Sequence, residues 1–226
     1  MESDGKISIV IPTRNEAEGI ADIVAKTLAF GDEVIVIDGH SADDTAELAG
    51  RAGAKVFQDN GRGKGDGLRV GIEKASFGIL VFMDADGSHE IEDIPKLVAP
   101  IRAGTADMVV GSRVKGGSDD FFINFDNLIR QVGSQFATYL VNRKFHATLT
   151  DIQNGFRAIK RSVALDLNLS SNDFEIEEEI VIRCLKKKYR IAEIDSHEYA
   201  RKWGASKLQT RKGWRMLYKL IRELLF

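Results

Sequence analysis

Short apolar runs alternate with helical patterns through the first half of the chain. Apolar and β-branched residues dominate five segments of strand length, residues 7–11, 33–37, 55–58, 79–83 and 107–110. The segments between them carry apolar residues at spacings of three and four, which predicts helices over residues 16–28, 43–52, 65–75 and 92–102. The chain therefore begins with repeated strand–helix units.

The strand-like segments are mostly continuous apolar runs, without regular alternation of apolar and polar residues. Strands of this kind are typical of parallel sheets that are covered by helices on both faces. We therefore expect an α/β fold with a mostly parallel, Rossmann-like sheet. Ligands of such folds bind at the carboxyl ends of the strands, which places residues 12–16, 38–41, 84–89 and 111–113 in the candidate site.

The pattern changes after residue 115. A glycine-rich turn precedes predicted helices over residues 122–142 and 175–187 and predicted strands over residues 156–159 and 190–195. We expect this half to shape the acceptor side of the site. No internal repeat or low-complexity linker marks a second domain. The prediction is one domain over residues 1–210 and a C-terminal helix over residues 211–226.

The composition is that of a folded, water-soluble domain, with 226 residues of which 43% are hydrophobic and 29% charged. The single cysteine, Cys184, excludes an intrachain disulfide and a cysteine-rich zinc site, and its helical apolar surroundings predict a core position. The histidines are not spaced as zinc ligands. With no signal-peptide pattern and no apolar run near the ~18 residues that span a bilayer, we expect a cytoplasmic protein without a transmembrane helix.

Charge is distributed unevenly along the chain. Residues 201–226 hold eight basic side chains and one acidic one, a net charge of +7 that leaves −9 on residues 1–200. A basic segment on an acidic body indicates an anionic partner such as a phosphate, a nucleic acid or a lipid surface. Nucleic acid is not expected, because the basic charge is confined to this one segment.

Two carboxylates, Asp84 and Asp86, follow the apolar segment 79–83 directly. Carboxylate oxygens suit Mg²⁺ or Mn²⁺, and such an ion usually reaches the protein through one or two carboxylates while substrate phosphates and water complete its shell. The alternative is a solvated acidic turn in which Asp86 and Gly87 are the turn formers.

Five segments of the first half stand in a characteristic order: residues 9–16 (IVIPTRNE), 36–45 (VIDGHSADDT), 63–65 (GKG), 84–86 (DAD) and 111–113 (GSR). Their order and spacing resemble glycosyltransferase family 2, which has the GT-A fold. Three later segments, residues 151–157 (DIQNGFR), 174–180 (FEIEEEI) and 201–207 (RKWGASK), are similar to its polyprenyl-phosphate branch, which includes dolichol-phosphate mannosyltransferases and their glucosyl relatives. Eight motifs in the correct order are hard to obtain by chance.

The resemblance implies a role for each matching residue. The base and ribose pocket would be lined by Pro12, Arg14, Glu16 and Asp38. Further contacts to the nucleotide sugar would come from Lys64 and Ala85, and the ligands of Mg²⁺ or Mn²⁺ on the diphosphate would be Asp84 and Asp86. Phosphates would be bound by Arg113, Arg201 and Lys207. A cation and arginines suit this task, because cleavage of the anomeric C–O bond leaves a nucleoside diphosphate with growing negative charge.

The implied reaction is inverting transfer of a hexose to a polyprenyl (dolichyl) phosphate, with mannose from GDP-mannose favoured over glucose from UDP-glucose. A lipid phosphate is already anionic at neutral pH and can attack without a strong general base. The expected catalytic residues are Asp86, Arg113 and Asp151. Asp151 either acts as a base or acceptor positioner, or orders the loop before Gly155.

Three features depart from the family pattern. Relatives of the mannosyl branch usually carry a glutamine where Ser88 stands, before His89, so the metal shell is expected to be completed differently. The second acid after the second strand is replaced by Gly39, which leaves the base preference open. Relatives also often bear C-terminal transmembrane helices, which this sequence lacks.

The basic tail is expected to take the place of those helices. Between residues 212 and 226 apolar side chains recur at spacings of three and four: Trp214, Leu217, Tyr218, Ile221, Leu224 and Leu225. Such a helix can lie in the interface of an anionic membrane, which would make the protein peripheral on the cytoplasmic face. Alternatively it packs on the domain with its basic face in solvent.

Three other functions are weighed against this one. The same donor chemistry could serve a soluble acceptor. The changes at Ser88 and Gly39 also fit a non-catalytic module that binds a nucleotide and a membrane. Nucleotidyl transfer to a sugar phosphate is disfavoured, because the first strand ends in residues 12–16 (PTRNE) and not in a glycine-rich basic loop.

Overall fold

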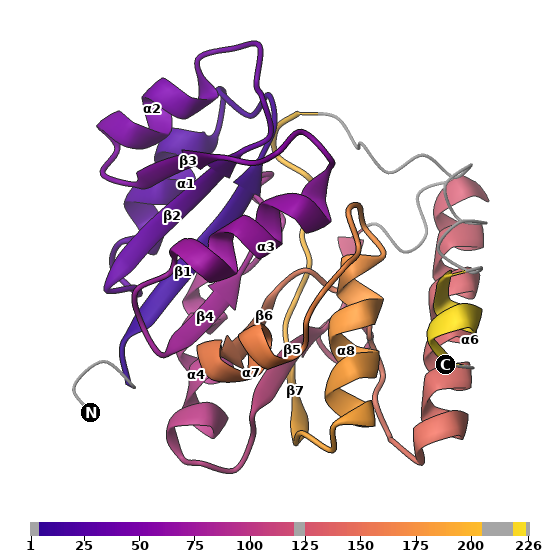
Figure 1. Ribbon diagram of the computed structural model, residues 1–226. Helices are drawn as coiled ribbons and strands as arrows, with labels where there is room; N and C mark the ends of the chain where they lie inside the picture. The colour runs from indigo at the N-terminus through magenta and orange to yellow at the C-terminus, as the bar shows by residue number, and fades with distance from the viewer. Residues whose placement is uncertain (1–4, 120–124, 205–218, 225–226) are drawn as a thin grey trace.

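The computed structural model describes residues 5–119, 125–204 and 219–224, and within them seven strands form one sheet (Figure 1). The strands are β1 (Ile7–Thr13), β2 (Glu33–Asp38), β3 (Lys55–Gln58), β4 (Ile79–Phe82), β5 (Met108–Ser112), β6 (Arg157–Lys160) and β7 (Ile191–Asp195). Their order is β3-β2-β1-β4-β6-β5-β7. β6 runs antiparallel to β4 and β5, and the other neighbours are parallel. The predicted mostly parallel α/β sheet is confirmed.

Helices cover both faces of the sheet, as predicted. They are α1 (Ile20–Thr27), α2 (Thr45–Arg51), α3 (Lys64–Lys74), the 3₁₀ turn η1 (Ile91–Asp93), α4 (Ile94–Arg102), α5 (Arg113–Gly116), α6 (Phe125–Phe145), α7 (Arg161–Asp166) and α8 (Ile176–Lys186). Apolar side chains of α1, α2 and α4 pack on one face, and those of α3, α7 and α8 pack on the other. α6 lies outside α8 (Figure 1).

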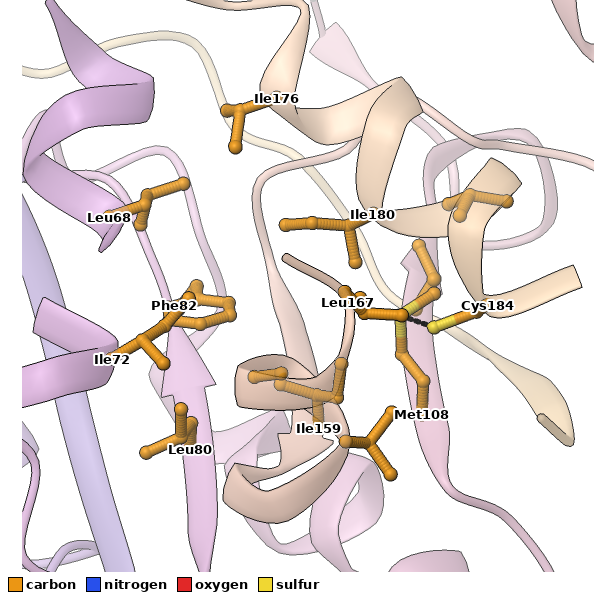
Figure 2. Close-up of a cluster of buried hydrophobic side chains, with 14 of the residues drawn as sticks. Leu68, Ile72, Leu80, Phe82, Met108, Ile159, Leu167, Ile176, Ile180 and Cys184 are labelled. Atoms are coloured by element: carbon orange, nitrogen blue, oxygen red, sulfur yellow. Dashed lines mark hydrogen bonds between the residues drawn. The ribbon is translucent and has the colours of Figure 1, made fainter. Parts of the chain in front are cut away.

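Alternate residues of the central strands contribute to two separate hydrophobic cores. In β1, Val10 belongs to the core beneath α3 and α8, whereas Ile9 and Ile11 belong to the core beneath α1 and α4. Figure 2 shows the first core, where Sγ of Cys184 lies 3.9 Å from Sδ of Met108. Burial raises the pKa of the Cys184 thiol to about 12. Cys184 is therefore the buried core residue that the sequence predicts, without the low pKa of a reactive thiol.

Most element boundaries lie within a few residues of the predicted ones, and the largest difference has a local cause. α1 begins at Ile20 and not at residue 16, because Asn15 has a left-handed φ of 52° and residues 15–17 donate backbone N–H groups to side chains of residues 41–45. The short helices α5 and α7 are not predicted by the hydrophobic pattern. The helix expected over residues 122–142 corresponds to α6, and residues 122–124 lie outside the described ranges.

The tail, expected to be a helix over residues 211–226, is described at residues 219–224, which are helical. This part packs on the domain: Leu220 is 2% exposed in the core shared with α6 and α8, and Glu223 pairs with Lys186 at 3.1 Å. Residues 211–218 and 225–226 lie outside the described ranges. The described part thus matches the packed alternative. No helix within those ranges is both long and apolar enough to cross a membrane.

Gly71 allows α3 to pack closely on β1. A Cβ at Gly71 would lie 2.3 Å from Cγ1 of Val10, whereas a Cβ at Gly133, on the exposed side of α6, would have nothing within 4 Å. We expect Gly71→Ala to lower the free energy of unfolding by roughly 1–3 kcal/mol through overpacking. Gly133→Ala should raise it by up to about 1 kcal/mol through helix propensity. Urea unfolding measures both, and a stabilising effect at Gly71 would contradict the close packing.

Candidate active site

A cleft of about 1340 Å³ opens at the carboxyl edge of the sheet, as predicted. The segments that follow β1, β2, β4 and β5 line it together with the start of α3, part of residues 150–155 and one side of α6. Ten of the twelve site residues named from the sequence line this cleft: Pro12, Arg14, Glu16, Lys64, Asp84, Ala85, Asp86, Arg113, Asp151 and Arg201. Of the other two, Asp38 is buried at the end of β2 and does not line the cleft, and Lys207 lies outside the described residues.

Asp38 has one carboxylate oxygen that accepts the backbone N–H of Ser41 at 3.1 Å. Its Oδ1 is buried and has no hydrogen-bond partner among the described residues. The same holds for the hydroxyl of Thr13, which pairs with Asp38 in the register of β1 and β2. Because buried polar atoms are normally hydrogen-bonded, a ligand or water is expected to supply partners at these two positions.

Asp84 lies at the end of β4 in a partly buried network of charges. Lys64, at the start of α3, places its Nζ 2.6 Å from Asp84 and 2.7 Å from Glu177 of α8. Burial alone would raise the pKa of Asp84, but the charge of Lys64 outweighs it and the pKa falls to about 2. Burial would lower the pKa of Lys64, and its two carboxylate partners raise it instead. Both groups are therefore charged at neutral pH.

Asp86 is held by Arg201, which follows β7 and is distant from Asp86 in the sequence. NH2 of Arg201 lies 2.8 Å from its Oδ2. Its Oδ1 accepts the backbone N–H and the hydroxyl of Ser88 at 3.1 and 2.7 Å. Ser88, which stands where the family usually has a glutamine, thus orients the Asp86 carboxylate.

Residues 197–204 cross the loop of residues 84–90, and we call this segment the strap. Backbone N–H groups of Tyr199 and Lys202 donate to carbonyls of that loop at 2.8 and 2.9 Å. The indole of Trp203 lies where a Cβ at Gly87, whose φ is +74°, would come within 2.6 Å. The strap therefore fixes both Arg201 and the loop that carries Asp86.

Arg113 and Asp151 form a two-point ion pair on another wall of the cleft, with Nε–Oδ2 and NH2–Oδ1 distances of 2.6 and 3.1 Å. Burial would raise the pKa of Asp151 and lower that of Arg113, but their attraction shifts each pKa in the opposite direction. The backbone N–H of Gln153 also donates to Asp151 at 3.1 Å. These contacts favour the role in which Asp151 orders the loop and positions Arg113, and its part in catalysis stays a prediction.

The end of β4 fits a divalent cation that is shared with a diphosphate. Asp84 and Asp86 supply two carboxylates, and among the described residues no group of three or more His, Cys, Asp or Glu side chains could hold a metal alone. Two carboxylates match hard-cation sites in which phosphate and water oxygens complete the shell. Lys64 and Arg201, which pair with these carboxylates, can also bind phosphate oxygens.

Sequence reasoning gives no role to three charged residues that support the site, although two of them lie in the motif segments 151–157 and 174–180. Arg157, which is 1% exposed, pairs with Glu177 at 2.6 Å, and Glu177 in turn holds Lys64. Glu198 of the strap lies 3.5 Å from Arg113. The acidic run of residues 175–179 has the sequence of a solvated helix start. Its burial therefore cannot be predicted from the pattern of α8 alone.

Glu178 is also buried, and it pairs with no cation within the described part of the chain. Its hydrogen-bond donor is the side-chain amide of Gln153, a residue that lines the cleft. Burial, with the charges of Glu175 and Glu177, raises the pKa of Glu178 to about 7, although the Gln153 hydrogen bond opposes this shift. The carboxyl is therefore partly protonated at neutral pH.

The mostly parallel sheet thus carries paired carboxylates and cations at its carboxyl edge. Comparison with known proteins gives the family. The model of "Glycosyl transferase family 2" matches residues 8–167, and the chain belongs to this family.

Relatives agree with this assignment, and a solved structure shares the fold. The chain is 32% identical to glycosyltransferase AglJ of Haloferax volcanii over 91% of this chain and 67% of that protein. It is 30% identical to an undecaprenyl-phosphate mannosyltransferase of Micrococcus luteus over 90% of this chain and 87% of that protein. The fold is similar to glucosyl-3-phosphoglycerate synthase of Mycobacterium tuberculosis, solved with Mn²⁺, UDP and glucosyl-3-phosphoglycerate, with a TM-score of 0.73 and 22% identity over 97% of this chain and 78% of that one.

Glu178 makes stability depend on pH. Its pKa is about 7 in the folded chain against an ordinary 4.5, so the stabilisation present below pH 4.5 is lost as the pH rises through 7. A shift of this size corresponds to about 3 kcal/mol. Glu178→Gln, which keeps a partner for Gln153, should raise the free energy of unfolding at about pH 8 and have little effect near pH 4.5, as measured by urea unfolding.

Glu179→Gln is the matched control. Burial opposes the shift, but hydrogen bonds from Ser171 and Ser170 lower the pKa of Glu179. This variant should therefore be less stable than the wild type at about pH 8, whereas Glu178→Gln should be more stable there. A loss of stability at pH 8 in Glu178→Gln as well would contradict the assignment of a raised pKa to Glu178.

Proposed function

We propose that the chain transfers a hexose from a nucleoside diphosphate donor to the phosphate of a polyprenyl acceptor. GDP-mannose is the favoured donor and UDP-glucose the second. The observation that carries the proposal is the pairing of Asp84 with Lys64 and of Asp86 with Arg201 in one cleft. The volume of about 1340 Å³ exceeds the roughly 300–1,000 Å³ of a site for one small molecule. It leaves room for donor and acceptor together.

In the proposed reaction an acceptor phosphate oxygen attacks the anomeric carbon of the donor sugar. A phosphate O–C1 bond forms, and the bond between C1 and the diphosphate oxygen breaks on the opposite side, with inversion. The bonding electrons leave with the nucleoside diphosphate. The nucleophile is already an anion, so no protein base is required. This agrees with an Asp151 carboxylate that is engaged by Arg113.

Asp84 and Asp86 are proposed to hold Mg²⁺ or Mn²⁺. When bound, such an ion would polarise the diphosphate and neutralise charge on the leaving group. Support comes from the structural neighbour that contains Mn²⁺ and UDP. Lys64 and Arg201 would bind diphosphate oxygens, and Arg113 would bind the acceptor phosphate. The same prediction for Lys207 concerns a residue outside the described ranges.

Two observations support a lipid acceptor. The first is the similarity to an undecaprenyl-phosphate mannosyltransferase. The second is α6, where Gln131, Ser134 and Gln135 line the cleft, while Val132, Phe136 and Tyr139 are 59%, 51% and 61% exposed. An exposed apolar strip beside a phosphate-binding cleft suits a protein that works on the cytoplasmic face of a membrane.

A soluble phosphate ester is the second candidate acceptor. The observation that favours it is the fold similarity to glucosyl-3-phosphoglycerate synthase, which was solved with a soluble phosphorylated product. Both candidates present a phosphate to the same cleft. They differ in what is attached to that phosphate, and the test below includes one of each.

A donor screen with a metal-site variant tests the proposal. Purified protein with Mn²⁺ or Mg²⁺ receives GDP-mannose or UDP-glucose and either a short polyprenyl phosphate or 3-phosphoglycerate, and released nucleotide and glycosylated acceptor are followed together. Asp86→Ala should lower turnover at least about 100-fold, because charge on the leaving group is then poorly neutralised. Its secondary structure should be unchanged.

The control is Asp22→Ala, which removes only an exposed pair with Lys26. It should turn over at the wild-type rate. Wild-type turnover in Asp86→Ala would exclude the metal-binding role. Absence of glycosylated acceptor with every combination of donor and acceptor would exclude the proposed function.

The exposed strip on α6 gives a separate prediction for membrane binding. Phe136→Ser should reduce co-sedimentation with vesicles of anionic phospholipid several-fold, because it removes apolar surface from the contact. Leu165→Ser, at a 44% exposed position on α7, is the control and should sediment like the wild type. Equal sedimentation of all three proteins would count against the α6 contact.

A further inference from the structure

The carboxyl end of β2 lacks an acidic side chain at the position that follows Asp38. Gly39 stands there, and a Cβ built on it would lie 3.5 Å from Oδ2 of Asp59. Asp59 comes from a different segment, the loop between β3 and α3. Its carboxylate thus lies next to the space that a side chain at Gly39 would enter.

Asp59 is firmly positioned by its own loop. Its backbone N–H donates to the carbonyl of Asp38 at 3.1 Å, and its Oδ1 accepts the backbone N–H of Gly61 at 2.7 Å. The side chain is only 5% exposed, yet the residue lines the cleft. Oδ2 accepts no hydrogen bond from any described residue. One oxygen therefore holds the loop, and the other remains available to a ligand.

The surroundings of Oδ2 suit a flat ring. A Cβ at Gly67 of α3 would meet Oδ2 of Asp59 at 3.5 Å, Cγ2 of Ile37 at 3.5 Å and Cβ of Pro12 at 3.6 Å. The carboxylate thus lies beside an apolar surface, and Ile37 and Pro12 both line the cleft. His40, 52% exposed, places Nε2 3.1 Å from the carbonyl oxygen of Asp59 and 3.5 Å from its Oδ1.

A carboxylate accepts hydrogen bonds and donates none. Uracil N3 and guanine N1 carry a hydrogen on the edge that such a group would contact. Cytosine N3 and adenine N1 carry a lone pair there, which would place a second acceptor against the carboxylate. A site of this kind selects strongly between bases of similar size.

We propose that Asp59 is the residue that reads the base of the donor, and that it selects uracil or guanine against cytosine or adenine. The inference rests on the proposed function, since it requires the nucleotide to bind in this cleft. The β3–α3 loop would thus recognise the base, because Gly39 has no side chain that could do so.

The test is binding of nucleoside diphosphates to the full chain with Mg²⁺, measured by calorimetry in matched pairs, UDP against CDP and GDP against ADP. In the preferred pair, the wild type should bind the nucleotide whose base carries the ring N–H at least about 100-fold more tightly than its partner. Asp59→Asn should reduce this ratio below about 10-fold, because an amide both donates and accepts. The ratio within one variant is independent of a general loss of affinity.

Two further variants keep the result interpretable. Asp166→Asn changes a surface carboxylate paired with Lys187 and should keep the wild-type ratio. If Asp59→Asn does not fold, Asp59→Ser retains an acceptor for Gly61 and should show the same reduced ratio. An unchanged ratio in the Asp59 variant, or wild-type preference for CDP or ADP, overturns the inference alone. Failure of all four nucleotides to bind overturns the proposed function and the inference with it.

Discussion

The site depends on a network of alternating charges, Arg157–Glu177–Lys64–Asp84, with contacts of 2.6 to 2.7 Å, which is buried at Arg157 and Glu177 and partly exposed at Asp84. These residues come from β6, from the starts of α8 and α3, and from the end of β4. Loss of one partner from such a chain leaves a buried charge uncompensated, at a typical cost of about 3–5 kcal/mol. This charge network therefore fixes the relative positions of four elements around the candidate metal ligand Asp84. Gly155 lies at its centre, where a Cβ would be 3.1 Å from both Asp84 and Lys64.

A second set of contacts joins the two halves of the sequence. The strap follows β7, yet its Arg201 pairs with Asp86 after β4, and its Glu198 pairs with Arg113 after β5. The same segment contributes Trp203, which packs against Gly19 and Gly87. The walls of the cleft that carry Asp86 and Arg113 are therefore bound to one another by a segment without regular secondary structure.

Much of the fold could be predicted from the sequence, because continuous apolar runs and helical spacing are local signals. The same is true of Asp84, Asp86 and Arg113, which directly follow strands. Glu177 and Glu178 could not be assigned, because an acidic helix start is usually solvated and its burial depends on partners far away in sequence. The direction of β6 was likewise not predictable, since a short apolar run carries no information on its orientation. Position 39 indicated a change in base recognition, but the proximity of Asp59 became visible only in three dimensions.

The antiparallel direction of β6 has an evolutionary consequence. In the parallel strands, the segments that face the cleft follow the strand, whereas in β6 the cleft-facing segment, residues 150–156, precedes it. Asp151 and Gln153 therefore belong to a different type of connection from the cleft residues that follow β1, β2 and β4. Under the proposed function, exchanges at Thr150, Asp151 and Gln153, which line the cleft, would change acceptor contacts without altering the register of the strands that precede Asp84 and Arg113. If the proposed function holds, the reversed strand would separate the residues open to exchange on the acceptor side from those that hold the donor.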